Sequence, residues 1–253
     1  MAAFFQNFPL INYNFGNEVN PALFQNISAY IKVIDDIADN IAFYTTVFIQ
    51  DYDRPDSFSY KLYRTTEFYW TFYYLNDDIR ESGWPLPQQD LLPKAKVDYP
   101  HRTITTTGNI SKTFLPGHTV TGSISGSTGT VIKRYLDLGQ IIVNSPNNFT
   151  AGENITPSIN GVAQIGDIVV VKSEVEQYNS VHHYEDASKD YVDIGLVPSG
   201  TGTGTFPSLS GKTPITYFDR ILAKNDSLRE IKVLKPDVAV QVQSEFNKLI
   251  QDL

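Results

Sequence analysis

The chain has 253 residues, 41% of them hydrophobic and 19% charged, so it can bury a sizeable core in one large or two small domains. Acidic residues outnumber basic ones by 28 to 20, and the net charge of −8 argues against nucleic-acid binding, which needs clustered Lys and Arg. The absence of cysteine excludes disulfides and thiolate metal sites. No apolar run approaches the roughly 20 residues of a membrane span, and the first 15 residues do not resemble a signal peptide. We therefore expect no membrane partner.

Residues 1–42 are predicted to form an arm followed by a helix. The first 20 residues are aromatic and Asn-rich without a clear period, which indicates an extended arm. Such an arm cannot bury Phe4, Phe5 and Phe8 by itself, so these side chains are candidate contacts with a protein partner. From residue 21 to 42, apolar residues recur at steps of three and four, the period of a helix. The many β-branched residues leave a strand open for the second half.

Residues 43–100 follow the order of a small LysM-like βααβ module. The aromatic and β-branched run at residues 43–49 predicts a strand. Asp53 stands where a helix N-cap is expected, and a second, strongly aromatic helix follows. Asn76 is expected to end that helix in the left-handed conformation. Residues 83–87, Gly-Trp-Pro-Leu-Pro, then predict a rigid extended exit, because Pro restricts its own backbone and that of its predecessor.

Residues 101–177 change character and predict an inserted all-β domain. They are rich in Thr, Ser, Gly, Val and Ile, with glycines at turn positions. An internal repeat aligns residues 114–126 with residues 149–161 at a constant offset of 35. The composition is typical of a small barrel or sandwich. The repeat is compatible either with two pseudo-symmetric halves of one barrel or with two similar hairpins.

Residues 178–253 are predicted to form a C-terminal strand-helix segment. It contains a Gly/Ser/Thr/Pro-rich stretch, residues 195–213, whose composition is typical of a flexible exposed loop. Residues 227–230 match a capping box, yet residues 231–234 alternate like a strand, so both readings stay open. A last helix is expected to begin at Pro236. Together the segments predict an α+β fold class.

The sequence offers no catalytic constellation. The adjacent His182 and His183 would point apart on a regular strand, and no His or carboxylate spacing matches a metal site. Neighbouring carboxylates such as Asp77 and Asp78 are expected to be solvated turn residues, because acid–base catalysis needs two carboxyls in different environments. We therefore expect no enzymatic activity, no cofactor and no metal.

Two groups of residues resemble a known family. The resemblance lies in Phe43-Tyr44, Asp53-Arg54-Pro55-Asp56, Ser59, Lys61-Leu62-Tyr63, Trp70, Leu75-Asn76, Gly83-Trp84-Pro85-Leu86, His182-His183-Tyr184-Glu185-Asp186 and residues 225–234. These segments resemble the baseplate wedge protein fifty-three family of contractile-tailed bacteriophages. The resemblance covers roughly residues 20–100 and 178–250. It leaves out residues 103–175, which are more weakly similar to Gly/Thr-rich β modules of phage structural proteins.

The resemblance implies a structural role in a virion. Members of that family are subunits of the sixfold tail baseplate, assembled in the host cytoplasm, and their LysM-like module makes protein–protein contacts. The implied partners are other baseplate wedge proteins, the sheath-like wedge subunit and neighbouring copies around the baseplate. Candidate interface residues are Arg54 and Arg229 in the matching segments, with Trp84 and Pro85 in the extended exit. Trp70, in the middle of the aromatic helix, is expected in the core.

Two alternative functions remain open from the sequence. The module could instead bind peptidoglycan or chitin, as sugar-binding LysM domains do, although its aromatic helix at residues 68–74 departs from the polar surroundings that a glycan groove needs. Residues 103–175 could alternatively form a carbohydrate-binding or adhesin module.

Overall fold

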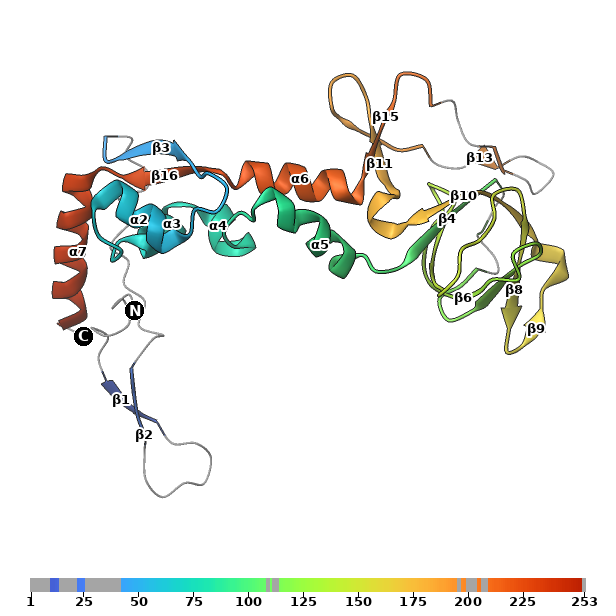
Figure 1. The fold of residues 1–253 in the computed structure, drawn as a ribbon, viewed down its shortest axis with the longest axis horizontal. Helices are drawn as coiled ribbons and strands as arrows, with labels where there is room; N and C mark the ends of the chain where they lie inside the picture. The colour runs from blue at the N-terminus through green and yellow to red at the C-terminus, as the bar shows by residue number, and fades with distance from the viewer. Residues whose placement is uncertain are drawn as a thin grey trace. The chain divides into compact units, whose positions relative to one another are not determined.

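The computed structural model describes residues 10–13, 22–25, 42–107, 110, 114–194, 197–198, 204–205 and 209–251 (Figure 1). The chain divides into two compact units: residues 1–88 together with 224–253, and residues 89–223. Helices and strands occur in both units, and the second unit contains a closed β-barrel. The predicted α+β class with a small all-β domain is confirmed at this level.

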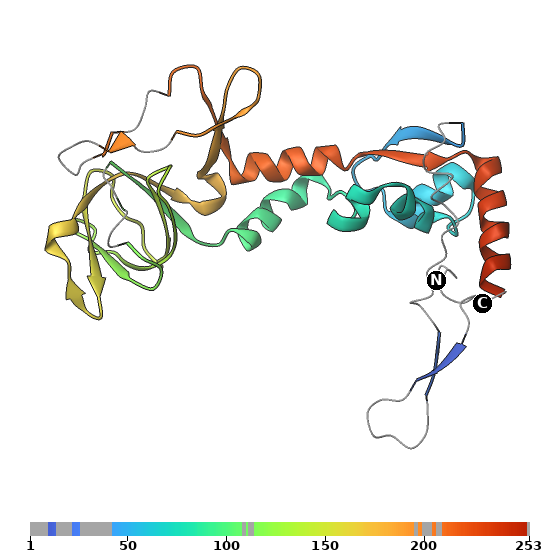
Figure 2. The same cartoon turned by 180° about the vertical axis from the view of Figure 1, so that it is seen from behind.

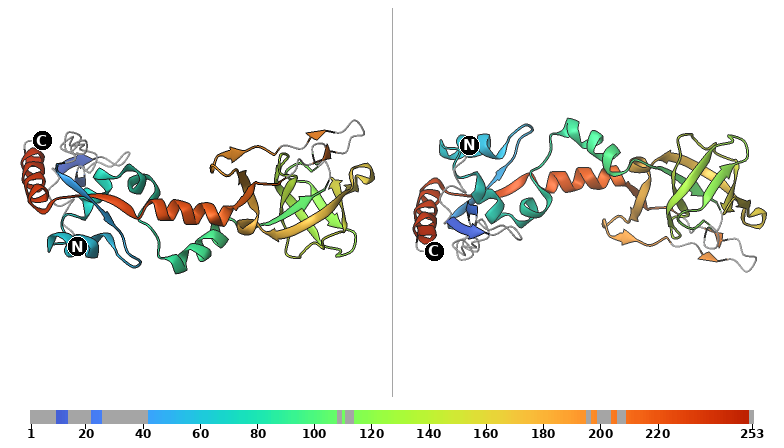
Figure 3. Two further views of the ribbon diagram at one scale, coloured as in Figure 1. Left: turned by 90° about the horizontal axis from the view of Figure 1, so that it is seen from above. Right: turned by 90° about the horizontal axis from the view of Figure 1, so that it is seen from below.

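The first unit is built from two separated stretches of sequence. Its described elements are β1 (Leu10–Tyr13), β2 (Ala22–Gln25), β3 (Tyr44–Phe48), α2 (Pro55–Tyr63), α3 (Tyr69–Leu75), α4 (Asp77–Ser82), β16 (Glu230–Leu234) and α7 (Pro236–Gln251). β3 and β16 form an antiparallel pair, with Val47 opposite Ile231 and Thr45 opposite Val233 (Figure 3). Of the two readings left open for residues 227–234, the strand is correct for β16. Its partner lies far away in the sequence.

The predicted helix over residues 21–42 is wrong at its beginning. Ala22–Gln25 is the strand β2, which pairs antiparallel with β1 so that Ile11 lies opposite Phe24. Cross-strand pairing therefore satisfies the backbone of both segments. The remainder of the predicted helix, residues 26–41, lies outside the described residues, as do Phe4, Phe5 and Phe8.

Two predicted helix ends are also corrected. The N-cap of α2 is Arg54 and not Asp53, because the Asp53 carboxylate accepts a hydrogen bond from the Gln50 backbone (3.1 Å) and pairs with Lys61. Asn76, which ends α3, is extended (φ −133°) rather than left-handed. The left-handed residue is Arg64, just after α2, with φ +62°.

A hydrophobic core holds the first unit together. β3 and β16 turn Val47, Ile231 and Val233 toward helices α2 and α3. The fully enclosed members are Ile49, Phe58, Phe72, Ile79, Leu228, Ile231 and Val233. Each side chain of this size contributes about 1.5–3 kcal/mol when removed from water. The core therefore depends on apolar residues from both ends of the chain.

The second unit contains the barrel. Its elements are α5 (Gln88–Asp98), β4 (Arg102–Thr106), β5 (Thr119–Gly122), β6 (Thr128–Tyr135), β7 (Gln140–Asn144), β8 (Asn154–Ile159), β9 (Val162–Ala163), η2 (Ile165–Asp167), β10 (Val169–Glu176), η3 (Gln177–Asn179), β11 (Val181–Glu185), β12 (Tyr191–Val192), β13 (Val197–Pro198), β14 (Gly204–Thr205), β15 (Thr213–Thr216) and α6 (Tyr217–Ser227), whose last turn reaches the first unit. The strand order β10-β4-β7-β6-β5-β8 closes through pairing of β10 with β8 (Figure 2). The barrel alternative is thus the one observed.

The internal repeat corresponds to two halves of this barrel. Thr121 and Thr156, which the offset of 35 makes equivalent, are direct cross-strand partners. Ile104 in β4 lies opposite Ile141 in β7 on the other side of the barrel. Three strands, β4 to β6, therefore match β7, β8 and β10 about a pseudo-twofold axis. Both copies of the turn glycine adopt positive φ, +88° at Gly117 and +87° at Gly152.

A buried carboxylate fixes one loop of the barrel. Glu153 is fully buried, and its oxygens accept hydrogen bonds from the backbones of Ile124 and Ser125 (both 2.9 Å) and of Thr150 (2.5 Å). A Cβ at Gly122 would lie 2.5 Å from Glu153 Oε2. Burial alone would raise the pKa of Glu153, but these hydrogen bonds outweigh it and lower that pKa below its usual value.

A β-bulge brings the two adjacent histidines together. The pairing of β11 with β15 sets Val181 opposite Thr216 and His183 opposite Ile215, so His182 is the extra residue. Its Nδ1 lies 3.0 Å from Nδ1 of His183. The expectation that the two rings point apart is therefore wrong, because a regular strand alternation does not hold across a bulge. Within the predicted flexible loop, residues 195–213, the described parts include the paired strands β13 and β14.

Candidate protein–protein interface

An aromatic cluster fixes the helices of the first unit around Trp84. The Trp84 ring packs edge-on against Phe58 (5.9 Å between ring centres) and lies 5.9 Å from Phe72. Its Nε1 donates a hydrogen bond of 2.6 Å to the backbone oxygen of Asp53. Trp84 is only partly exposed, and Pro85 is buried. The extended exit thus packs against the first unit through its Trp84 side chain.

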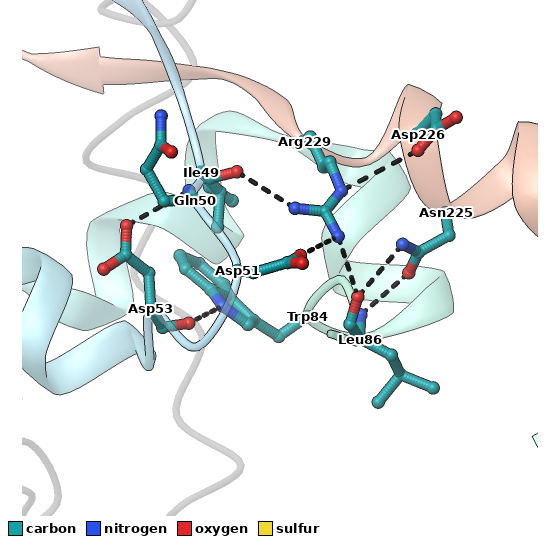
Figure 4. A network of polar contacts seen from close by, with 9 residues as sticks. All are labelled: Ile49, Gln50, Asp51, Asp53, Trp84, Leu86, Asn225, Asp226 and Arg229. Atoms are coloured by element: carbon teal, nitrogen blue, oxygen red, sulfur yellow. Dashed lines mark hydrogen bonds and ion pairs between the residues drawn. The ribbon is translucent and has the colours of Figure 1, made fainter. Parts of the chain in front are cut away.

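Arg229 stands at the centre of a polar network that ties three segments together (Figure 4). Only 8% of the residue is exposed. Its guanidinium donates to the backbone oxygens of Ile49 (3.4 Å) and Leu86 (3.0 Å), and it forms an ion pair with Asp51. Arg229 therefore joins the end of β3 to the segment after α4 and to β16. A planar guanidinium with several donors suits this task, which a Lys could not fill.

Asn225 reinforces the same junction. Its side-chain oxygen accepts a hydrogen bond from the Leu86 N–H (2.7 Å), and its amide donates to the Leu86 oxygen (3.1 Å) (Figure 4). Both backbone groups of Leu86 are thereby satisfied. Residues 83–86 and 225–234 thus meet in one place.

Beside this junction, several aromatic side chains remain exposed. Phe48 at the end of β3 is 56% exposed, Tyr52 in the following turn 66%, and Tyr60 on α2 54%. Tyr52 also has a left-handed backbone, with φ +68°. A non-Gly residue in that conformation carries strain of about 1–2 kcal/mol. Large exposed aromatic residues are typical anchors of protein interfaces. We call Phe48, Tyr52 and Tyr60 the aromatic surface.

The predicted interface residues fall into two groups in the structure. Arg54 is exposed, with an ion pair to Asp56 of 3.3 Å, and can reach a partner. Trp84, Pro85 and Arg229 have internal roles in the first unit. Sequence reasoning missed Phe48 and Tyr52. The exposure of Phe48 could have been predicted from strand alternation, because its neighbour Val47 faces the core.

A hydrogen-bonded chain of side chains lies in the second unit. Arg220 Nη1 donates to His182 Nε2 (2.7 Å), and His183 Nε2 lies 3.2 Å from Glu185. Because His182 Nε2 accepts a hydrogen bond from Arg220, the neutral His182 ring carries its proton on Nδ1. The Nδ1–H of His182 donates a hydrogen bond to Nδ1 of His183, and the Nε2–H of His183 donates one to the Glu185 carboxylate. Burial, and then the charge of Arg220, lower the pKa of His182 from 6.5 to about 4. The low pKa favours the neutral form of the His182 ring.

Within the residues that the structure describes, no group of three or more His, Asp or Glu side chains could hold a metal ion. No helix of the described part is both long and apolar enough to cross a membrane. Comparisons with known protein families, with curated proteins and with solved structures find no match to this chain.

Proposed function

We propose that this protein is a structural subunit that joins neighbouring proteins in the baseplate of a contractile phage tail, through protein–protein contacts and without enzymatic activity. The observation that carries the proposal is the junction around Arg229. The segments around residues 43–86 and 225–234, which resemble the wedge family, come from distant parts of the chain and form one unit with a common core, whereas the resembling residues 182–186 lie in the other unit. The barrel, which lies outside the resemblance, forms part of the other unit.

The arrangement of the first unit supports a LysM-like module with a distant second strand. In chain order, β3, α2, α3 and β16 give the βααβ order with the short helix α4 in addition, and the second strand is supplied after residue 223. The extended exit at residues 83–87 packs against this module through Trp84. A module built in this way can present an aromatic surface while the inserted residues reach a second partner.

Mass spectrometry of purified phage tails tests the proposal. We expect the chain in stoichiometric amounts in baseplates, together with other wedge proteins. Its absence from mature particles would contradict the proposal. Saturable binding of the purified chain to insoluble peptidoglycan would instead favour a LysM-type glycan binder, and loss of host attachment alone after deletion of residues 103–175 would favour an adhesin in the barrel.

A further inference from the structure

The outer edge of β3 is open. Backbone hydrogen bonds from Ile49 to Arg229 (2.8 Å) and from Lys235 to Phe43 (3.0 Å) show which residues of β3 face β16. Antiparallel strands alternate, so the N–H and C=O of Tyr44, Thr46 and Phe48 point the other way. Among the described residues, no hydrogen bond reaches these outward groups. β3 can therefore accept another strand.

The opposite edge of the same sheet is closed. The Asn76 side chain accepts a hydrogen bond from the Lys232 N–H (2.8 Å) and donates one to the Lys232 oxygen (2.9 Å), as a neighbouring strand would. The Tyr63 hydroxyl donates to the Leu234 oxygen (2.9 Å). Because side chains occupy both outward groups of Lys232 and the oxygen of Leu234, the edge of β3 is the less protected of the two edges among the described residues.

The β1–β2 hairpin offers exposed apolar side chains and strands that could pair with the open edge of β3. Two four-residue strands alone are marginally stable in water. Leu10 and Leu23, which the register places on one face, are each 62% exposed, and Tyr13 is 52% exposed. The hairpin thus carries apolar surface that this chain leaves uncovered. Strands of four residues also match the length of β3, which has five.

The charges of these strands favour association. Natural edge strands are commonly protected by charged residues, especially Lys. β1, β2 and β3 read Leu-Ile-Asn-Tyr, Ala-Leu-Phe-Gln and Tyr-Thr-Thr-Val-Phe, without a single charge. β16 carries Glu230 and Lys232 in addition to its Asn76 cover. Charged residues that hinder pairing with another strand are therefore present on β16 and missing from β3.

We propose that the β1–β2 hairpin of one copy adds to the outer edge of β3 in a neighbouring copy. Outward backbone groups of Tyr44, Thr46 and Phe48 would pair with the incoming strand, and Leu10 and Leu23 would lose their exposure to water. The contact is heterologous, since donor and acceptor are different surfaces, and such contacts form rings where the rotation between copies closes. This contact would join copies within the proposed baseplate, so its biological role rests on the proposed function. Hairpin and edge are both exposed within the single chain, which points to another copy as the cover.

Three variants separate the acceptor edge from the donor hairpin. Thr46→Pro removes an outward N–H that makes no hydrogen bond to any residue that the structure describes, and proline is tolerated on such an edge. Phe48→Lys is a second acceptor variant, which adds a protecting charge at a site that is 56% exposed. Leu10→Asp combined with Leu23→Asp blocks the donor at exposed positions. The melting temperatures of all three variants should equal that of the natural chain. Thr45→Pro should have a lower melting temperature, because the Thr45 N–H faces Val233 in β16.

Analytical ultracentrifugation of the full-length protein then measures whether copies associate. The natural chain should form species larger than the 28.4 kDa of one copy, and each blocked variant alone should remain at that mass. An equimolar mixture of the donor-blocked and acceptor-blocked variants should form a heterodimer of twice that mass, because each supplies what the other lacks. A natural chain that stays monomeric at every concentration would overturn the proposal. So would a donor-blocked variant that still self-associates, since that result indicates edge-to-edge pairing of β3. These results concern self-association, so they are independent of whether the chain occurs in phage tails.

Discussion

The side chain of Asn76 pairs with both backbone groups of Lys232, at 2.8 and 2.9 Å, although 156 residues separate them in the sequence. A third hydrogen bond, from the Asn76 amide to the Phe72 oxygen (2.8 Å), fixes that side chain to the end of α3. The amide thus takes the place of a missing strand beside β16. One side chain both ends a helix and closes a sheet edge.

Removal of this side chain should destabilise the first unit. Asn76→Ala leaves the Lys232 groups to solvent and is expected to cost about 1–2 kcal/mol, since each such hydrogen bond has a net worth of about 0.5–1.5 kcal/mol. Asp78→Ala, at an exposed position of the same helical region, is the matched control and should change little. Denaturant unfolding measures both. Equal stabilities of the two variants would show that the Asn76 contacts contribute nothing.

Two arginines of the first unit, Arg54 and Arg229, should respond differently to substitution. Arg229→Ala leaves the oxygens of Ile49 and Leu86 without their donor, and we expect a loss of about 2–4 kcal/mol in the free energy of unfolding. Arg54→Ala, whose side chain is 79% exposed, should stay within about 0.5 kcal/mol of the natural chain. Chemical denaturation of both variants tests this contrast. A comparable loss in both would contradict the internal role assigned to Arg229.

The left-handed backbone of Tyr52 predicts a stabilising substitution. Tyr52→Asn should raise the free energy of unfolding by about 1 kcal/mol, because Asn adopts this conformation more readily and the Tyr52 ring is largely exposed. Tyr60→Asn is the control, since Tyr60 is equally aromatic and exposed but lies within α2. The melting temperature should rise for Tyr52→Asn alone. A parallel fall in both variants would mean that Tyr52 is not strained. If the aromatic surface binds a partner, the Tyr52 variant should bind less while being more stable.

The histidine chain predicts a pH dependence for the second unit. The pKa of His182 is about 4 in the folded state against 6.5 ordinarily, so the unfolded state takes up a proton that the folded state refuses. This contribution is complete above pH 6.5 and declines as the pH falls toward 4. Arg220, His183, Lys133 and Asp137 are the charged or titratable groups that act on this ring. His182→Gln should flatten the stability profile between pH 6.5 and 4, measured by denaturant unfolding. An unchanged profile would contradict the assignment.

Local patterns in the sequence predicted much of the fold. β3 follows from its β-branched and aromatic residues, the barrel from its Thr- and Gly-rich composition and its repeat, and α7 from apolar spacing after Pro236. Other features depend on contacts between distant segments. The strand that pairs with β3 lies far along the chain, since Ile49 and Arg229 are 180 residues apart, and no local period encodes such a pairing. The bulge at His182 escaped prediction because an inserted residue looks the same as a paired one in the sequence.

The candidate interface was predicted less well than the fold. Residue type suggested Trp84 and Arg229, since Trp and Arg are common interface anchors, but both side chains have their partners within the first unit. Burial depends on which segments meet, and the pairing of β3 with β16 could not be foreseen from either alone. Phe48 and Tyr52 are exposed for the same reason: the core lies on the Val47 face of β3.

Electron microscopy of phage particles produced without this protein tests the central claim most directly. If the chain joins neighbouring subunits of the baseplate, such particles should lack complete baseplates and contracting tails, and the natural chain supplied in trans should restore both. Complete tails that contract normally in its absence would contradict the account.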